Sequence, residues 1–146
     1  MSVPIPIRER AHGGEPTATL TLPFDLRCRS RLRATLDDGR EAALLLPRGT
    51  VLRDADRLRA DDGTVIEVRA AREPVSTVRA GDARALARAA YHLGNRHVAL
   101  QVGDGWLRYQ HDHVLDDMVR GLGLEVSAEE VELEPETGAY AREHGR

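Results

Sequence analysis

Short stretches in the first half of the chain alternate apolar and polar residues, which is the pattern of strands with one buried face. The expected strands cover residues 17–22, 25–36, 41–46 and 64–70. Asp38-Gly39 is a tight hairpin signal between the second and third of them, and Asp61-Asp62-Gly63 marks another turn. Short strands at close spacing with such turns predict a small all-β domain.

Two segments of this half lack the alternation. Residues 1–16 are interrupted by prolines and glycines and are interpreted as an irregular lead, and residues 54–58 are interpreted as a loop. Glu73-Pro74 is the expected boundary, because proline pushes the preceding residue into an extended conformation. The N-terminal domain is therefore assigned to residues 1–73.

The second half combines strand patterns with two helices that have an apolar stripe at helical spacing. Strands are expected at residues 75–80, 97–102 and 106–110, with a last strand formed from 124–126 and 131–133. Asp82 and Asp112 can each cap a helix by accepting from free backbone N–H groups, so helices are expected over residues 83–93 and from Asp112 to about Leu122. The order β-α-β-β-α-β is that of a ferredoxin-like domain.

This second domain is assigned to residues 74–134, and residues 135–146 are expected to form a flexible C-terminal tail. The predicted fold class is α+β, with a small all-β domain followed by the ferredoxin-like one. Both domains are small for independent folding, which favours oligomerisation.

Composition narrows the function. The chain has 146 residues and a formal net charge of -3, whereas a dedicated nucleic-acid-binding domain is usually strongly basic. Cys28 is the single cysteine, which is compatible with a reducing cytosol, and its place in a strand pattern predicts that it is buried. We find neither a signal peptide nor an apolar run of about 20 residues, so we expect a cytoplasmic protein without a membrane partner.

His97 is the first candidate metal ligand. It follows Gly94-Asn95-Arg96, where Gly94 is expected to close the helix in the left-handed conformation and His97 to begin a strand. Imidazole is a preferred ligand of nickel, copper and zinc. One imidazole makes a weak site, but two chains related by a two-fold axis can share one ion. The alternative is a surface histidine bonded to a neighbouring carbonyl group.

His111 and His113 form a second candidate, a His-x-His pair. If the strand extends through them they share a face and can reach one ion, whereas a helix that begins at Asp112 gives a looser arrangement. Asp112 is then available to the helix cap rather than to the ion. His144 in the tail is an auxiliary candidate. The alternative is a pair of solvated histidines at a strand end.

Four arginines at every second position support a rival interpretation. In a strand, all four would point to one face; they are Arg27, Arg29, Arg31 and Arg33. Such a face could bind RNA or an acidic protein partner, with incidental metal binding elsewhere. Aromatic residues are only 3% of the chain, so base-stacking platforms are scarce. A solvated face, or a docking face for an acidic protein, fits better.

Enzymatic activity is not expected. A zinc hydrolase usually carries a His-Glu-x-x-His helix, which this sequence lacks. Gly103-Asp104-Gly105 is interpreted as a hairpin turn rather than a phosphate-binding loop. A metallohydrolase is a third interpretation, which would require turnover of a substrate with added metal.

Several blocks along the chain resemble one family. They are Ala90–His97, Leu107–Tyr109, His111–Met118, Glu134–Tyr140, Arg29–Arg31, Leu46–Gly49 and Asp61–Ile66. The family is UreE, the urease accessory proteins that act as nickel metallochaperones. The Gly94-Asn95-Arg96-His97 block is the specific part of this resemblance, and the other blocks support it collectively.

The resemblance implies an N-terminal domain similar to peptide-binding chaperone modules and a ferredoxin-like domain through which two chains dimerise. It makes His97 the Ni²⁺ ligand shared at the dimer interface, with His111 and His113 as secondary ligands. Ni²⁺ would pass to a urease accessory GTPase of the UreG type and then to apo-urease, and Zn²⁺ or Cu²⁺ would compete. The chain lacks the long histidine-rich tail of many members, which implies low storage capacity. Ala80-Gly81 stands where some members carry a cysteine, which excludes a thiolate ligand there.

Overall fold

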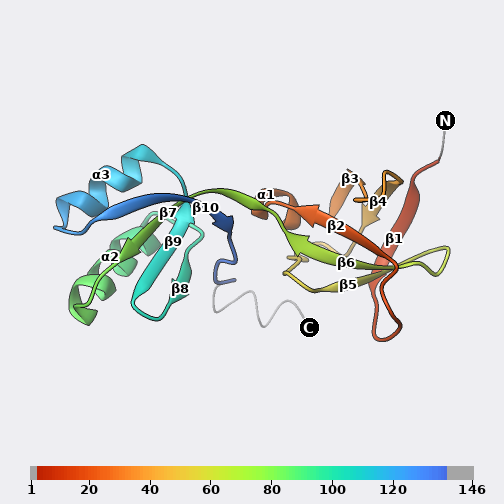
Figure 1. The fold of residues 1–146 in the computed structure, drawn as a ribbon, viewed down its shortest axis with the longest axis horizontal. Helices are drawn as coiled ribbons and strands as arrows, with labels where there is room; N and C mark the ends of the chain where they lie inside the picture. Colours follow the sequence, from red (N-terminus) through yellow and green to blue (C-terminus); the bar gives the residue numbers. More distant parts are fainter. Residues whose placement is uncertain (1–2, 138–146) are drawn as a thin grey trace. The chain divides into compact units, whose positions relative to one another are not determined.

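The computed structural model describes residues 3–137 of the chain. These residues form two compact units that divide between Ala71 and Arg72. The first unit is built almost entirely of strands, and the second combines two longer helices with an antiparallel sheet (Figure 1). The α+β fold class that the sequence predicts is therefore confirmed.

The N-terminal unit contains six strands and one short helix. They are β1 (Ile5–Arg10), β2 (Ala18–Leu22), α1 (Phe24–Arg27), β3 (Arg31–Thr35), β4 (Glu41–Leu45), β5 (Arg57–Ala60) and β6 (Val65–Ala70). The strands form one sheet in the order β2-β6-β5-β1-β4-β3. Alternate apolar side chains along them point inward and form a single core, which includes Ile7, Leu20, Leu44, Leu58 and Ile66.

The two edge strands of this sheet are joined through Asp37, which follows β3. The Asp37 backbone N–H donates to the carbonyl of Thr19 on β2 (2.9 Å). In return, the hydroxyls of Thr19 and Thr21 donate to Asp37 Oδ2, at 2.6 and 2.7 Å. Since β2 and β3 are the first and last strands of the sheet order, these bonds bring the sheet close to a closed barrel.

Strand β1 differs from the irregular lead expected for residues 1–16. It pairs in parallel with β4 and antiparallel with β5, with Ile7 beside both Leu44 and Ala60. Proline has no N–H to donate, which is why Pro6 argued against a strand. Its carbonyl nevertheless accepts from the N–H of Asp61 (2.9 Å), so Pro6 still takes part in the pairing.

The single strand expected over residues 25–36 is wrong. The chain forms α1, then β3 from Arg31, and only Arg31 and Arg33 lie together on the exposed face of β3. Arg27 is buried in α1, where its guanidinium donates to the carbonyls of Leu22 (3.0 Å) and Leu52 (3.2 Å). Arg29 lies exposed between the two elements. The four-arginine face therefore does not exist.

Cys28, at the end of α1, is exposed rather than buried. The expectation of burial depended on the same strand over residues 25–36. A helical turn rotates side chains by a different angle from a strand, so the alternation no longer decides which residues face inward.

The C-terminal unit has the order β-α-β-β-α-β expected from the sequence. Its elements are β7 (Arg72–Arg79), α2 (Ala83–Asn95), β8 (Gln101–Gly103), β9 (Trp106–Gln110), α3 (His113–Gly121) and β10 (Val126–Glu132). The sheet order is β10-β7-β9-β8, with all neighbours antiparallel. This is the ferredoxin-like arrangement, in which each β-α-β half leaves room for a strand of the other half.

Both helices pack on one face of this sheet. The core contains Val78 and Leu107 from the strands, Ala89 and Leu93 from α2, and Val119 from α3. The last strand is continuous rather than two short pieces. Within residues 3–137, no helix has both the length and the apolar character needed to cross a membrane.

Candidate metal centre

His97 lies in the turn that ends α2. The helix continues through Gly94 to Asn95, and Arg96 follows as its C-cap. His97 itself has a φ of 57°, and its backbone N–H donates to the Gly94 carbonyl (3.0 Å). The left-handed residue of this turn is therefore His97 and not Gly94, and the following strand begins at Gln101 rather than at His97.

This backbone conformation is unusual for a residue with a side chain. A left-handed φ costs a residue other than glycine about 1 kcal/mol, because Cβ crowds the following carbonyl oxygen. The side chain of His97 is exposed, so no burial of the ring compensates for this cost. Strained residues of this kind concentrate at functional sites. Ala55, with a φ of 70°, also has this conformation, but His97 combines it with a side chain that can bind a metal ion, which makes the His97 turn a candidate site.

His111 and His113 do not share a strand face. Strand β9 ends at Gln110, and His113 is the first residue of α3. Asp112 caps the helix, since its Oδ1 accepts from the N–H groups of Val114 (2.9 Å) and Leu115 (3.2 Å). Of the two arrangements open from the sequence, the structure has the looser one, in which a helix begins at Asp112.

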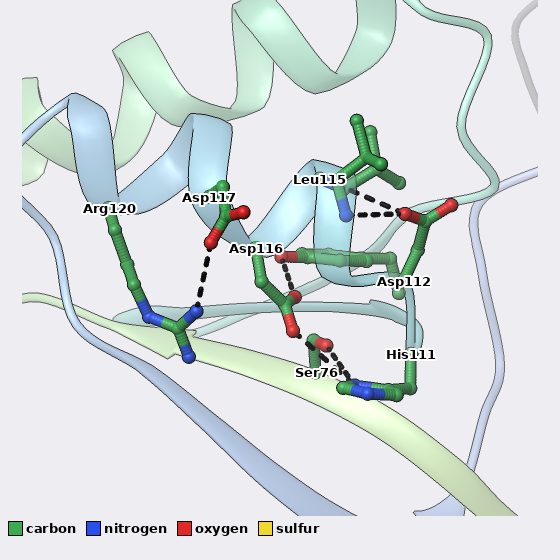
Figure 2. A network of polar contacts seen from close by, with 9 residues as sticks. Ser76, His111, Asp112, Leu115, Asp116, Asp117 and Arg120 are labelled. Atoms are coloured by element: carbon green, nitrogen blue, oxygen red, sulfur yellow. Dashed lines mark hydrogen bonds and ion pairs between the residues drawn. The ribbon is translucent and has the colours of Figure 1, made fainter.

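His111 takes part in a network of polar contacts that the sequence did not predict (Figure 2). Its Nδ1 lies 3.1 Å from Ser76 Oγ and 3.4 Å from Asp116 Oδ2. The other carboxylate oxygen of Asp116 accepts from the Tyr109 hydroxyl at 2.7 Å. We refer to Ser76, Tyr109, His111 and Asp116 as the His111 network.

The inner members of the His111 network are buried. Ser76, Tyr109 and Asp116 are enclosed between the sheet and α3, whereas His111 is exposed. Burial and the adjacent Asp116 carboxylate raise the pKa of the Tyr109 hydroxyl well above its ordinary value, and a hydrogen bond from Ser76 opposes them. Tyr109 therefore keeps its proton and acts as a donor to Asp116 at neutral pH.

Asp116 is the member of the His111 network that sequence analysis does not single out. As an acid in the first turn of α3 it suits the positive end of the helix, and its residue type alone indicates no further role. The available signal was its position: Asp116 lies three residues before the inward-facing Val119, on the apolar side of the helix. A carboxylate on that side must find donors in the interior.

The structure thus leaves the candidate ligands in separate places. His97 follows α2, while His111 and His113 flank the start of α3. His144 lies outside the described residues. No group of three or more His, Cys, Asp or Glu side chains placed to hold a metal ion occurs between residues 3 and 137.

Comparison with known proteins matches both units to the same family. Residues 6–71 match the family "UreE urease accessory protein, N-terminal domain", and residues 73–146 match "UreE urease accessory protein, C-terminal domain". Together the two matches cover nearly the whole chain.

Individual relatives carry the same description. The chain is 67% identical over 123 residues to the urease accessory protein UreE of Alkalilimnicola ehrlichii, covering 84% of this chain and 76% of the relative. It is 63% identical over 125 residues to that of Pseudomonas putida (strain GB-1), covering 85% and 76%. For the protein of Citrobacter koseri, the identity is 60% over 131 residues, covering 88% and 86%. The chain therefore belongs to the UreE family of urease accessory proteins, which are chaperones and not enzymes.

Proposed function

We propose that this protein binds Ni²⁺ and delivers it for assembly of the urease metal centre. Membership of the UreE family carries this proposal, because the family implies nickel as the cargo. In the proposed mechanism, the protein works in the cytoplasm and releases the ion to a urease accessory GTPase of the UreG type, which passes it to apo-urease.

His97 is the proposed primary ligand. Its exposed ring, on a turn with a strained backbone, is free to meet a second copy of itself across a two-fold axis. Two imidazoles then share one ion, and the remaining coordination positions stay open to ligands of the receiving protein. Such a site holds the ion and still permits transfer.

His111 and His113 are proposed as secondary ligands, with His144 as an auxiliary one. Both described rings are exposed beside the N-terminus of α3. A second ion held there would raise the capacity of the dimer without replacing the site at His97. Since zinc and copper also bind imidazole readily, they would compete with nickel at both places.

The two halves of the chain are proposed to divide the work. Residues 1–73 would dock a partner protein, and the exposed Arg31 and Arg33 on β3 give that domain a basic strip suited to an acidic partner. Residues 74–134 would bind the metal and dimerise. The segment expected to be a flexible tail begins with an ordered contact, because the Glu136 N–H donates to the Leu100 carbonyl (2.8 Å), and its residues 138–146 lie outside the described part of the chain. With Arg27 buried, the argument for RNA binding loses its main support.

Nickel titration combined with native mass spectrometry tests the primary site. The expected result is one tightly bound Ni²⁺ per two chains, lost in His97→Ala while the dimer mass is unchanged. His12→Ala is the matched control, because His12 is also exposed but lies in the N-terminal unit. If His97→Ala still binds Ni²⁺ as tightly as wild type, His97 is not part of the primary site.

A further inference from the structure

We propose that Asp116, itself held by Tyr109, is a positioning residue that presents Nε2 of His111 to a divalent transition-metal ion. This inference rests on the proposed role of His111 as a secondary nickel ligand. It adds the reason why that ring is ready to bind before any metal arrives.

The two nitrogens of the His111 ring have different surroundings, one facing the protein interior and the other facing outward. Nδ1 of His111 lies 3.1 Å from Ser76 Oγ and 3.4 Å from Asp116 Oδ2. Figure 2 shows the ring turned toward these two side chains. Among residues 3–137, no hydrogen bond reaches Nε2, and the His111 side chain is 47% exposed. The inner nitrogen is thus engaged by the protein, while the outer nitrogen is accessible to an ion.

Asp116 cannot easily turn away from this arrangement. Its side chain is only 4% exposed, and a buried carboxylate without hydrogen-bond donors is costly. Oδ1 accepts from the Tyr109 hydroxyl at 2.7 Å, and Tyr109 is fully buried on β9. The tyrosine therefore fixes one oxygen, which leaves Oδ2 directed at His111.

The start of α3 sets the distance between the two groups. The Asp116 N–H donates to the Asp112 carbonyl (2.9 Å), so Asp116 lies one helical turn after the cap residue. His111 immediately precedes that cap. The same turn of helix that Asp112 stabilises therefore brings Asp116 beside Nδ1 of His111.

This geometry selects one neutral form of the imidazole. A carboxylate beside Nδ1 favours the tautomer with its proton on Nδ1, and the lone pair then lies on Nε2. Carboxylate–histidine pairs of this kind orient metal ligands and make them more basic, and removing the carboxylate typically lowers metal affinity by about 10- to 100-fold.

The decisive experiment measures the tautomer of His111 in the metal-free, full-length protein. Long-range ¹H–¹⁵N correlation spectra, recorded well above the ordinary histidine pKa of about 6.5, should show the proton of His111 on Nδ1. In Asp116→Asn this preference should weaken. A wild-type spectrum with the proton on Nε2 would overturn the proposal, and that measurement needs no variant to fold.

Asp117→Asn is the matched control. Asp117 is the next residue on the same helix, but it is exposed and faces Arg120 at 3.5 Å rather than His111. The tautomer should be unchanged in this variant. Tyr109→Phe removes only the hydroxyl and should shift the tautomer in the same direction as Asp116→Asn. An equal shift in Asp117→Asn would show a general effect of helix charge and contradict a positioning role.

Metal affinity supplies the second readout. In a His97→Ala background, Asp116→Asn should weaken Ni²⁺ binding by about 10-fold or more, whereas adding the same change to His111→Ala should cause no further loss. If the losses of Ni²⁺ affinity from Asp116→Asn and His111→Ala add, Asp116 does not act through His111, and the proposal is overturned. Because the tautomer is read without metal, failure of nickel binding at His97 would leave that measurement intact, so the two proposals can fail separately.

Discussion

The Thr19 hydroxyl donates a hydrogen bond of 2.6 Å to Oδ2 of Asp37 and so joins the two edges of the N-terminal sheet. Thr21 adds a second hydroxyl donor to the same oxygen at 2.7 Å. Burial raises the pKa of the Asp37 carboxyl, but the hydrogen bonds from Thr19 and Thr21 outweigh it, and the net pKa lies below the ordinary value.

Replacing Asp37 with alanine should destabilise the N-terminal unit by about 1 kcal/mol, because the donors on β2 lose their acceptor. The effect should depend on pH. Since the folded-state pKa lies below the unfolded value of about 3.9, the contribution is present above that value and is lost as the pH falls through the folded pKa. The difference in unfolding free energy between Asp37→Ala and wild type should therefore shrink in acid.

Denaturant unfolding of wild type and Asp37→Ala at neutral and acidic pH measures this difference in unfolding free energy. Thr19→Val provides the partner variant for a double-mutant cycle, where contact residues typically show a coupling of about 0.5 kcal/mol or more. A pH-independent loss in Asp37→Ala would mean that ionisation of the carboxyl does not contribute.

Gly103 has no room for a side chain, because a Cβ there would overlap the ring of Trp106. The ring also contacts the guanidinium of Arg108, whose Cζ lies 4.4 Å from the ring centroid. We expect Gly103→Ala to displace the ring and to cost about 1–3 kcal/mol through overpacking. Trp106 is the single tryptophan, so its fluorescence reports the displacement directly.

Gly94→Ala is the contrasting variant. Gly94 is helical, and a Cβ there meets nothing within 4 Å. The substitution should stabilise α2 by about 0.5–1 kcal/mol and leave the Trp106 fluorescence unchanged. Destabilisation by Gly94→Ala would contradict the helical conformation found for this residue.

The left-handed φ of His97 predicts that glycine and alanine will differ at this position. Both His97→Gly and His97→Ala remove the imidazole and should lose the tight nickel ion. His97→Gly should be the more stable of the two by about 1 kcal/mol, because glycine adopts a φ of 57° without strain. Thermal unfolding of the two variants measures the cost of the left-handed backbone, and nickel titration measures the loss of the imidazole ligand.

Asp112 should act on stability rather than on metal binding. Asp112→Ala removes the acceptor for the N–H groups of Val114 and Leu115 and should cost about 1 kcal/mol, whereas Asp112→Ser should retain most of the cap. Nickel stoichiometry should be the same in Asp112→Ser and in wild type. A lost ion in that variant would make Asp112 a ligand.

The elements that follow local rules could be predicted from the sequence. Asp82 and Asp112 cap α2 and α3 as expected, and the hairpin at Asp38-Gly39 joins β3 to β4. In each case a short segment contains both the signal and the structure. The ferredoxin-like order then follows from the sequence of elements alone.

The errors occur where distant residues decide the structure. Pro6 reads as a strand breaker, and only its neighbours β4 and β5, far along the chain, make a strand of that segment. The alternation predicts that Arg27 lies on an exposed strand face, but two carbonyl groups in the interior accept hydrogen bonds from its guanidinium. The alternation of apolar and polar residues identifies neither the strands that pair with β1 nor the carbonyl groups that bind Arg27.

The candidate site shows the same limit. The sequence identified His97 and His111 as ligand candidates through their residue type and motif. The left-handed backbone of His97 and the buried Asp116 behind His111 depend on how α2 ends and how α3 packs. The sequence therefore indicates the candidate ligands, but neither the backbone conformation of His97 nor the carboxylate beside His111.

The position of β1 between β4 and β5 has a consequence for biosynthesis. Strand β1 is an interior strand of its sheet, and both of its neighbours follow it in the chain, the later one ending at Ala60. During translation both edges of β1 therefore stay unpaired until the segment that ends at Ala60 has followed it out of the ribosome. Unpaired strand edges are prone to aggregation, so we expect the nascent N-terminal unit to need protection during this interval.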